Sequence, residues 1–102
     1  MSNLIIWPIL DYAVKIGASD IHMSEWENLW FRVNWVLWKA DWTIIDNTKI
    51  KLILLELLHW NQETSDEFLK GKDLDFAYIH SDWTPFRING FFKLGKIAFV
   101  MR

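Results

Sequence analysis

Apolar residues recur every three or four positions in three separate segments of the chain, which is the spacing of one face of an α-helix. The repeat predicts helices over residues 3–16, 48–60 and 62–70. Gly17 follows the first segment, where a glycine commonly ends a helix in the left-handed conformation. We therefore expect one helix at the start of the chain and two near its centre.

Elsewhere apolar and polar residues alternate, which is the pattern of half-buried strands. Strands are predicted over residues 19–24, 29–34, 36–41, 73–80, 84–92 and 96–102, with a turn region at 41–47. Short connections between consecutive strands favour an antiparallel sheet with helices packed mainly on one face. The expected fold class is α+β, with one sheet of about six strands.

The composition is that of one globular domain. The chain has 102 residues, 52% hydrophobic and 24% charged, with a formal net charge of -2. This length suffices for one core and not for two ordinary domains. Cysteine is absent, which excludes disulfides and thiolate metal sites. No cluster of lysine and arginine marks a nucleic-acid-binding face, so we expect no nucleic-acid partner.

Membrane-spanning and secretory segments are also not apparent. No stretch approaches the roughly 20 apolar residues that cross a bilayer. Residues 1–6 lack the basic region that begins a secretory signal. A cytoplasmic location is therefore expected.

Acidic residues and histidines offer few sites for chemistry. Asp20 and His22 share one face of a predicted strand, as do Asp73 and Asp75. Either pair would suit a cation or acid–base chemistry. The favoured interpretation is a structural polar pair for the first and a solvated strand face for the second, because nothing completes a ligand set. We expect no metal site.

Two arginines on predicted strands attract more interest. Arg87 lies between apolar neighbours, and Arg102 ends the last strand. A guanidinium group on a strand can bind phosphate as a planar, permanently charged fork. From spacing alone, the preferred interpretation is a surface ion pair of Arg87 with Asp73 or Asp75. The sequence contains no P-loop motif, so the chain cannot hold a nucleotide in that way.

Several short motifs together resemble the PilT-type pilus retraction ATPases, within the GspE/PilB/PilT secretion ATPase superfamily. Those ATPases carry GASDLH, RVNG, DFSY and FRVN…VLR in this order. The matching segments here are GASDIH at residues 17–22, RVN at 32–34, LDFAY at 74–78, FRIN at 86–89 and VMR at 100–102. Each motif is weak alone, but their shared order covers essentially the whole chain.

The resemblance implies that residues 1–102 form the N-terminal, PAS-like domain of a hexameric motor. The catalytic RecA-like domain, which carries the P-loop, is then absent from this truncated chain. The family's strand arginines reach the ATP phosphates, and they correspond to Arg87 and Arg102. A further family arginine between those strands has no counterpart, and Lys93 or Lys96 replaces at most its charge. ATP and magnesium are implied for the full-length protein, and none for this chain, which should be catalytically silent.

The resemblance also implies a role in pilus retraction, and hence in twitching motility. The implied partners are the chain's own RecA-like domain, neighbouring subunits of the hexamer and the platform protein of the pilus in the inner membrane. The implied location is the cytoplasmic face of the bacterial inner membrane. The alternative is a free-standing PAS-like module for ligand binding or interaction, which predicts a pocket that retains a small molecule.

The tryptophan content is abnormal, with eight tryptophans against four glycines. Several stand where turns normally need glycine. These are Trp26, Trp35, Trp42, Trp60 and Trp83. Some bacteria read the codon UGA as glycine, and a translation that reads it as tryptophan would create this pattern.

The remaining tryptophans, Trp7, Trp30 and Trp38, lie in periodic segments, and the sequence does not sort them. If indoles are really present at the turns, each forced left-handed residue costs about 1–2 kcal/mol. Exposed indoles also favour self-association of the chain.

Overall fold

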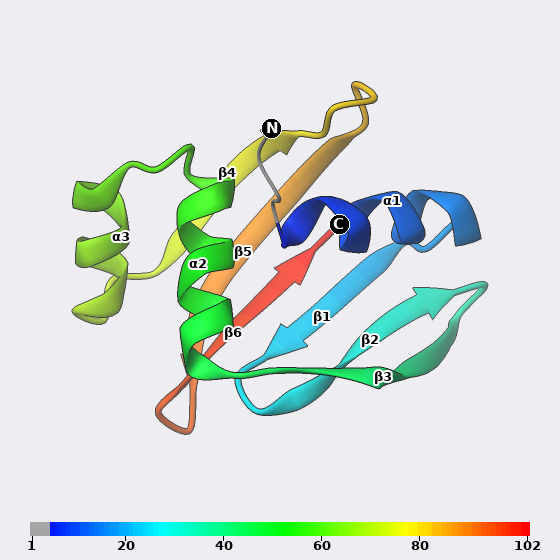
Figure 1. Cartoon of the computed structure of the whole chain (residues 1–102), viewed down its shortest axis with the longest axis horizontal. Coiled ribbons are helices and arrows are strands. Elements are labelled where there is room, and N and C mark those ends of the chain that lie inside the picture. Colours follow the sequence, from blue (N-terminus) through cyan, green and yellow to red (C-terminus); the bar gives the residue numbers. More distant parts are fainter. Residues whose placement is uncertain (1–4) are drawn as a thin grey trace.

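The computed structural model describes residues 5–102, with side chains at every position except 41–43. The elements follow the order helix, three strands, two helices, three strands (Figure 1). They are α1 (Ile6–Ile16), β1 (Asp20–Ser24), β2 (Glu27–Val33), β3 (Val36–Ile45), α2 (Asn47–Leu57), α3 (Gln62–Leu69), β4 (Leu74–Ile79), β5 (Pro85–Lys93) and β6 (Lys96–Met101).

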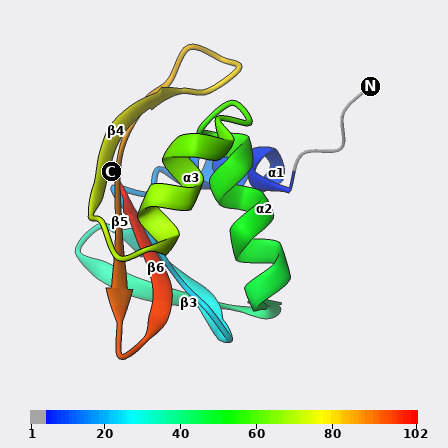
Figure 2. The same cartoon turned by 90° about the vertical axis from the view of Figure 1, so that its left-hand side faces the viewer.

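All six strands form one antiparallel sheet in the order β3-β2-β1-β6-β5-β4. Each half of the sheet is a run of three consecutive strands, and the pairing of β1 with β6 joins the halves. Figure 2 shows the three helices on one side of the sheet. The predicted α+β class is therefore confirmed. None of the described helices lies on the opposite side (Figure 2), which is called the outer face below.

The helix ends follow from local capping. Gly17 adopts the left-handed conformation and ends α1, as the sequence predicted. The carboxylate of Asp46 accepts a hydrogen bond from the amide of Lys49 and begins α2. The Asn61 side chain accepts the amide of Thr64 and begins α3 in the same way.

The core lies between the sheet and the helices. Alternate strand residues such as Ile21 of β1 and Ile88 of β5 are buried beneath Ile53 and Leu54 of α2. Gly90 of β5 keeps space for aromatic rings, because a Cβ there would lie 3.1 Å from Phe99 and 3.2 Å from Phe68. The inward residues of the central strands thus pack in the core, and only the outward residues are available to bind a ligand or a partner.

The end of the third strand was predicted wrongly. Residues 41–47 were expected to form a turn, but β3 runs on almost to the start of α2. Ala40 pairs with Leu29 while Ile44 pairs with the preceding Asn28, so three extra residues of β3 interrupt the ladder. This irregularity breaks the two-residue alternation on which the sequence prediction relied.

The first helix is fixed by a side chain from far along the chain. The buried carboxylate of Glu56 on α2 accepts hydrogen bonds from the amides of Ile5, at 3.0 Å, and Ile6, at 2.9 Å. The first turn of a helix exposes unpaired amides and a partial positive charge, and a carboxylate satisfies both. Glu56 therefore docks α1 onto α2.

We expect Glu56→Ala to lower the free energy of unfolding by about 2–3 kcal/mol, because it leaves buried amides without an acceptor. Glu56→Gln, which keeps one acceptor oxygen, should lose less. Glu67→Ala, at an exposed position of α3, should change stability by less than about 0.5 kcal/mol. Urea unfolding measures all three, and equal losses for Glu56→Ala and Glu67→Ala would contradict this role.

Candidate functional site

Arg87 of β5 and Arg102 at the end of β6 lie directly opposite each other on the outer face. Their backbones exchange both hydrogen bonds, with N···O distances of 2.9 and 2.8 Å. The flanking residues Phe86, Ile88 and Met101 are buried on the helix side, so strand alternation turns both arginines away from the core. The structure thus brings together the two arginines that the sequence singled out.

Arg87 is engaged by a carboxylate on the neighbouring strand. Its Nε and Nη2 donate to the two carboxylate oxygens of Asp75 at 2.7 and 2.9 Å. This hydrogen bond holds the pKa of Asp75 below its ordinary value and raises the pKa of Arg87. The predicted surface ion pair is confirmed, and of the two candidate partners, Asp73 and Asp75, it uses Asp75. Both side chains are largely exposed, so the pair is open to exchange with another anion.

Arg102 differs from Arg87 in its partner. Its Nη1 donates to the amide oxygen of Asn89 at 3.0 Å, and within residues 5–102 it forms no ion pair with a carboxylate. Asn89 is neutral, so the charge of the Arg102 guanidinium is not balanced by its own hydrogen-bond partner. Arg102 is therefore the better placed of the two arginines to receive an anion.

A third arginine, which the sequence analysis did not single out, extends the same row. Arg32 of β2 is paired with Asp20 of β1, and its Nε lies 2.9 Å from the Asp20 carboxylate. The register that pairs Ile21 with Met101 places Asp20 beside Arg102. Arg32, Asp20, Arg102 and Arg87 therefore follow one another across β2, β1, β6 and β5. We call these four residues the arginine row. Only the strand register shows that Arg32 belongs to this row, and the register is known only from the structure.

His22 lies next to the arginine row but does not pair with Asp20, whose carboxylate is taken by Arg32. Its Nε2 is buried and has no hydrogen-bond partner. Burial lowers the pKa of His22; the charge of Asp20 opposes this shift, and the charges of Arg32 and Arg102 add to it. The neutral imidazole is therefore favoured. The predicted polar pair of Asp20 and His22 is wrong, because the Asp20 carboxylate binds Arg32 and the His22 Nε2 has no partner.

A hollow of about 240 Å³ adjoins the arginine row on the outer face. Its lining is mixed, with His22, Trp30, Phe91 and Val100 among the contributors and Lys93 at the same surface. Aromatic residues such as Trp30 and Phe91 are enriched in protein interfaces, so this lining is typical of a contact surface.

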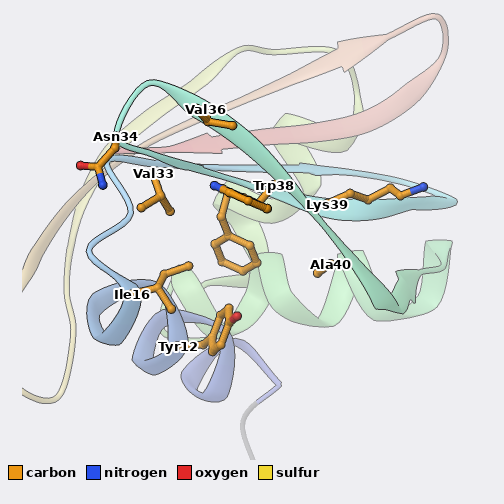
Figure 3. Close-up of a pocket in the computed structure, with 9 residues that line it drawn as sticks. Tyr12, Ile16, Val33, Asn34, Val36, Trp38, Lys39 and Ala40 are labelled. Carbon is orange, nitrogen blue, oxygen red and sulfur yellow. The ribbon is translucent and has the colours of Figure 1, made fainter.

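A second hollow, of about 470 Å³, lies on the helix side where α1 meets the β2–β3 hairpin. Figure 3 shows Tyr12 and Ile16 of α1 facing Val33 and Trp38 of the strands. Phe31 forms part of its lining and packs edge-on against Tyr12, with ring centroids 5.3 Å apart. This helix-side hollow is mostly apolar, and its volume suits a small molecule.

The sequence also provided no signal for an ion pair between a buried histidine and an exposed aspartate. Nε2 of His80, whose side chain is fully buried, lies 2.5 Å from the carboxylate of Asp11 on α1. The imidazole packs edge-on against Trp7 and Phe86. It fixes α1 to the end of β4, which is a structural role.

The part of the chain that the structure describes holds no group of three or more histidine, aspartate or glutamate side chains placed to bind a metal ion. None of its helices has the length and apolar character needed to cross a membrane.

Comparison with solved structures places this fold beside two ATPases. The pilus retraction motor PilT, solved with bound ADP, superposes with a TM-score of 0.79 at 20% identity, over 95% of this chain and 28% of the PilT chain. The ATPase DotB of Legionella pneumophila gives a TM-score of 0.74 at 21% identity, over 100% of this chain and 29% of the DotB chain. The chain thus shares their fold and spans less than a third of either length. No protein-family model and no curated protein matches the sequence.

The lowered pKa of His22 predicts a pH dependence of stability. The unfolded imidazole takes up a proton below about pH 6.5, before the folded one does, so the free energy of unfolding falls as the pH drops below that value. We expect His22→Gln to reduce this fall, measured as the shift in urea midpoint between about pH 7.5 and pH 5.5. His59→Gln, at an exposed histidine, is the control. An unchanged shift in His22→Gln would refute the assignment.

Proposed function

We propose that this chain is the N-terminal domain of a motor ATPase of the PilT-type secretion superfamily, and that its arginine row faces the nucleotide. One observation carries the proposal. Arg87 and Arg102, which the family motifs select, lie side by side on a helix-free sheet face, and Arg102 has no carboxylate partner in the described chain. The fold shared with PilT and DotB supports it.

The chemistry of the row suits phosphate. A guanidinium group presents a planar fork of N–H donors and stays charged at any relevant pH, and it binds phosphate through paired hydrogen bonds. Arg102 has only a neutral amide, that of Asn89, to exchange for the phosphate. Arg87 must first leave Asp75, which holds it extended over the sheet through two exposed hydrogen bonds. Because that pair is solvated, exchange of the carboxylate for a phosphate costs little.

This chain supplies only half of a nucleotide site. It has no P-loop, so the proposed catalytic domain must cradle the phosphates and hold the magnesium ion. The residues of the chain bind and orient, and the positive charge of Arg87 and Arg102 balances the negative charge that builds up on the phosphates during transfer. The full-length protein is then an ATP-hydrolysing motor, and the isolated chain is inactive.

The same proposal extends to the assembly. The hollow on the outer face, with His22, Trp30 and Phe91, is a suitable contact for the catalytic domain of the same or a neighbouring subunit of a hexamer. The motor would work in pilus retraction and twitching motility, at the cytoplasmic face of the bacterial inner membrane, against a platform protein of the pilus. The motif resemblance supports these finer assignments.

A second candidate function rests on the helix-side hollow. Its volume of about 470 Å³ and its lining, which includes Tyr12, Phe31 and Trp38, suit an apolar small molecule. A free-standing PAS-like module would use this hollow for its ligand and would have no need of the arginine row.

In the full-length motor, we expect Arg102→Ala and Arg87→Ala each to lower kcat for ATP hydrolysis by about 10²-fold or more, because each removes a fixed positive charge from the phosphates. Arg102→Lys should recover only part of the loss, because lysine keeps the charge and loses the fork. The measurement is steady-state ATPase activity with kcat and KM determined separately.

Lys72→Ala is the matched control for these variants, since it removes an exposed cation outside the arginine row. It should leave kcat unchanged. Thermal unfolding of each variant shows whether the domain stays folded, as expected for exposed side chains. Wild-type activity in folded Arg102→Ala and Arg87→Ala proteins would overturn the assignment of the two arginines.

A second experiment separates the two candidate functions. We expect the isolated chain to show no ATP hydrolysis and, in native mass spectrometry after purification, to carry no small molecule. A retained ligand that Phe31→Ala or Tyr12→Ala releases would favour the free-standing module instead. ATP hydrolysis by the isolated chain, with contaminating ATPases excluded, would contradict the half-site.

A further inference from the structure

Four tryptophans of this chain have the backbone conformation of glycine. The φ angles are 65° at Trp26, 70° at Trp35, 65° at Trp60 and 70° at Trp83. L-residues avoid this left-handed region because the Cβ crowds the backbone, and a bulky residue there is a genuine outlier. Four such outliers of one residue type, all in connections between elements, call for a common cause.

Two hairpin turns of this chain have the same length and can be compared directly. The β5–β6 hairpin turns through Leu94 and Gly95, with φ angles of 52° and 79°. The β2–β3 hairpin turns through Asn34 and Trp35, with φ angles of 49° and 70°. A two-residue turn with both φ positive is the type I′ turn, for which Asn-Gly is the preferred pair. Trp35 therefore stands where the equivalent hairpin has glycine.

The β4–β5 connection follows another glycine-dependent pattern. The amide of Trp83 donates to the carbonyl of His80 at 2.8 Å, and the amide of His80 donates to the carbonyl of Thr84 at 2.9 Å. This is a three-residue hairpin loop that ends in a left-handed residue, a position usually taken by glycine. Trp83 occupies that position.

The connection after α2 also contains a left-handed tryptophan, but at a different position from the one that the sequence suggested. The amide of His59 donates to the carbonyl of Glu56, and the amide of Trp60 donates to the carbonyl of Leu55 at 2.7 Å. These two bonds form a Schellman motif whose C′ residue is His59, so Trp60 is one position later than the sequence suggested. His59 is itself left-handed, with a φ of 53°, and Trp60 is left-handed directly after it, with a φ of 65°.

No packing explains indoles at these sites. Trp35 is 90% exposed and Trp83 is 85% exposed, while Trp26 and Trp60 are more than half exposed. Burial therefore offers little to offset the strained backbone.

The other described tryptophans have ordinary φ angles. Trp7, Trp30 and Trp38 lie within α1, β2 and β3, and Trp7 donates a hydrogen bond to the hydroxyl of Tyr78 at 3.1 Å. The backbone thus sorts the tryptophans, which the sequence did not. The side chain of Trp42 lies outside the described residues.

The geometry points to glycine as the natural residue at positions 26, 35, 60 and 83, encoded by UGA codons that the source organism reads as glycine. The fold then needs no strained tryptophan, and each of the four connections has the residue that its φ angle demands. Trp7, with an ordinary φ and a hydrogen bond through its indole, is a true tryptophan encoded by UGG.

The gene and the natural protein test the decoding. We expect UGA at codons 26, 35, 60 and 83 and UGG at codon 7. Peptide masses from protein made in its source should show glycine at the four positions. UGG at the four positions, or tryptophan in the natural peptides, would overturn the proposal.

Paired variants test the backbone argument independently of the gene. At an ordinary strand position alanine is more stabilising than glycine, but at a left-handed position the order reverses, because alanine keeps the strained Cβ. We expect Trp35→Gly and Trp83→Gly to unfold at a Tm roughly 4–8 °C above Trp35→Ala and Trp83→Ala. At Trp30, a control on β2, the alanine variant should be the more stable.

Both alanine and glycine remove the indole, so the comparison isolates the backbone. A Tm for Trp35→Gly and Trp83→Gly at or below that of the alanine variants would refute the geometric premise. Light scattering adds a second readout: replacing all four tryptophans by glycine should abolish the concentration-dependent self-association that exposed indoles favour. Identical scattering before and after would count against the indoles as its cause.

Discussion

The first and last strands of the chain lie next to each other, and their antiparallel pairing joins two three-stranded sheets into one. Without this pairing the helices would have no continuous surface to cover. The register also aligns Ile21 with Met101 and so places Asp20 beside Arg102. The buried Glu25 reinforces the junction, because its carboxylate accepts the amide of Ile97 and the side-chain amide of Asn47. The core and the arginine row thus depend on one contact between distant segments.

The outer face balances charge along that contact. Like charges directly opposite on neighbouring strands repel, and Arg87 and Arg102 are such a pair. Asp75 forms an ion pair with Arg87, and the nearby Asp20 forms one with Arg32. Arg102 is left with a neutral amide partner. This surplus positive charge favours contact with an anion, and this links the electrostatics of the sheet to the proposed nucleotide contact.

Acidic side chains tie the layers together. Glu56 caps α1 from α2, Glu25 links the β1–β2 turn to β6, and His80 fixes α1 through Asp11. A buried carboxylate is costly unless it is hydrogen-bonded, and the buried carboxylates of Glu56 and Glu25 both have partners. The helices are therefore located by specific polar contacts as well as by apolar packing. The outer face, which carries none of these contacts, remains available for a partner.

The sequence by itself determined the α+β class, the order of the elements and the end of α1 at Gly17, because these depend on periodicity and on local turn chemistry. It also predicted an acidic partner for Arg87 on the neighbouring strand, but only the structure chose Asp75 over Asp73. The sequence pattern missed the extension of β3, where extra residues break the alternation. Only the tertiary structure decided that Arg32 joins Arg102, that Glu56 caps α1, and which tryptophans stand at glycine-like φ angles. Register, burial and backbone dihedrals arise from contacts between distant segments, which no local pattern encodes.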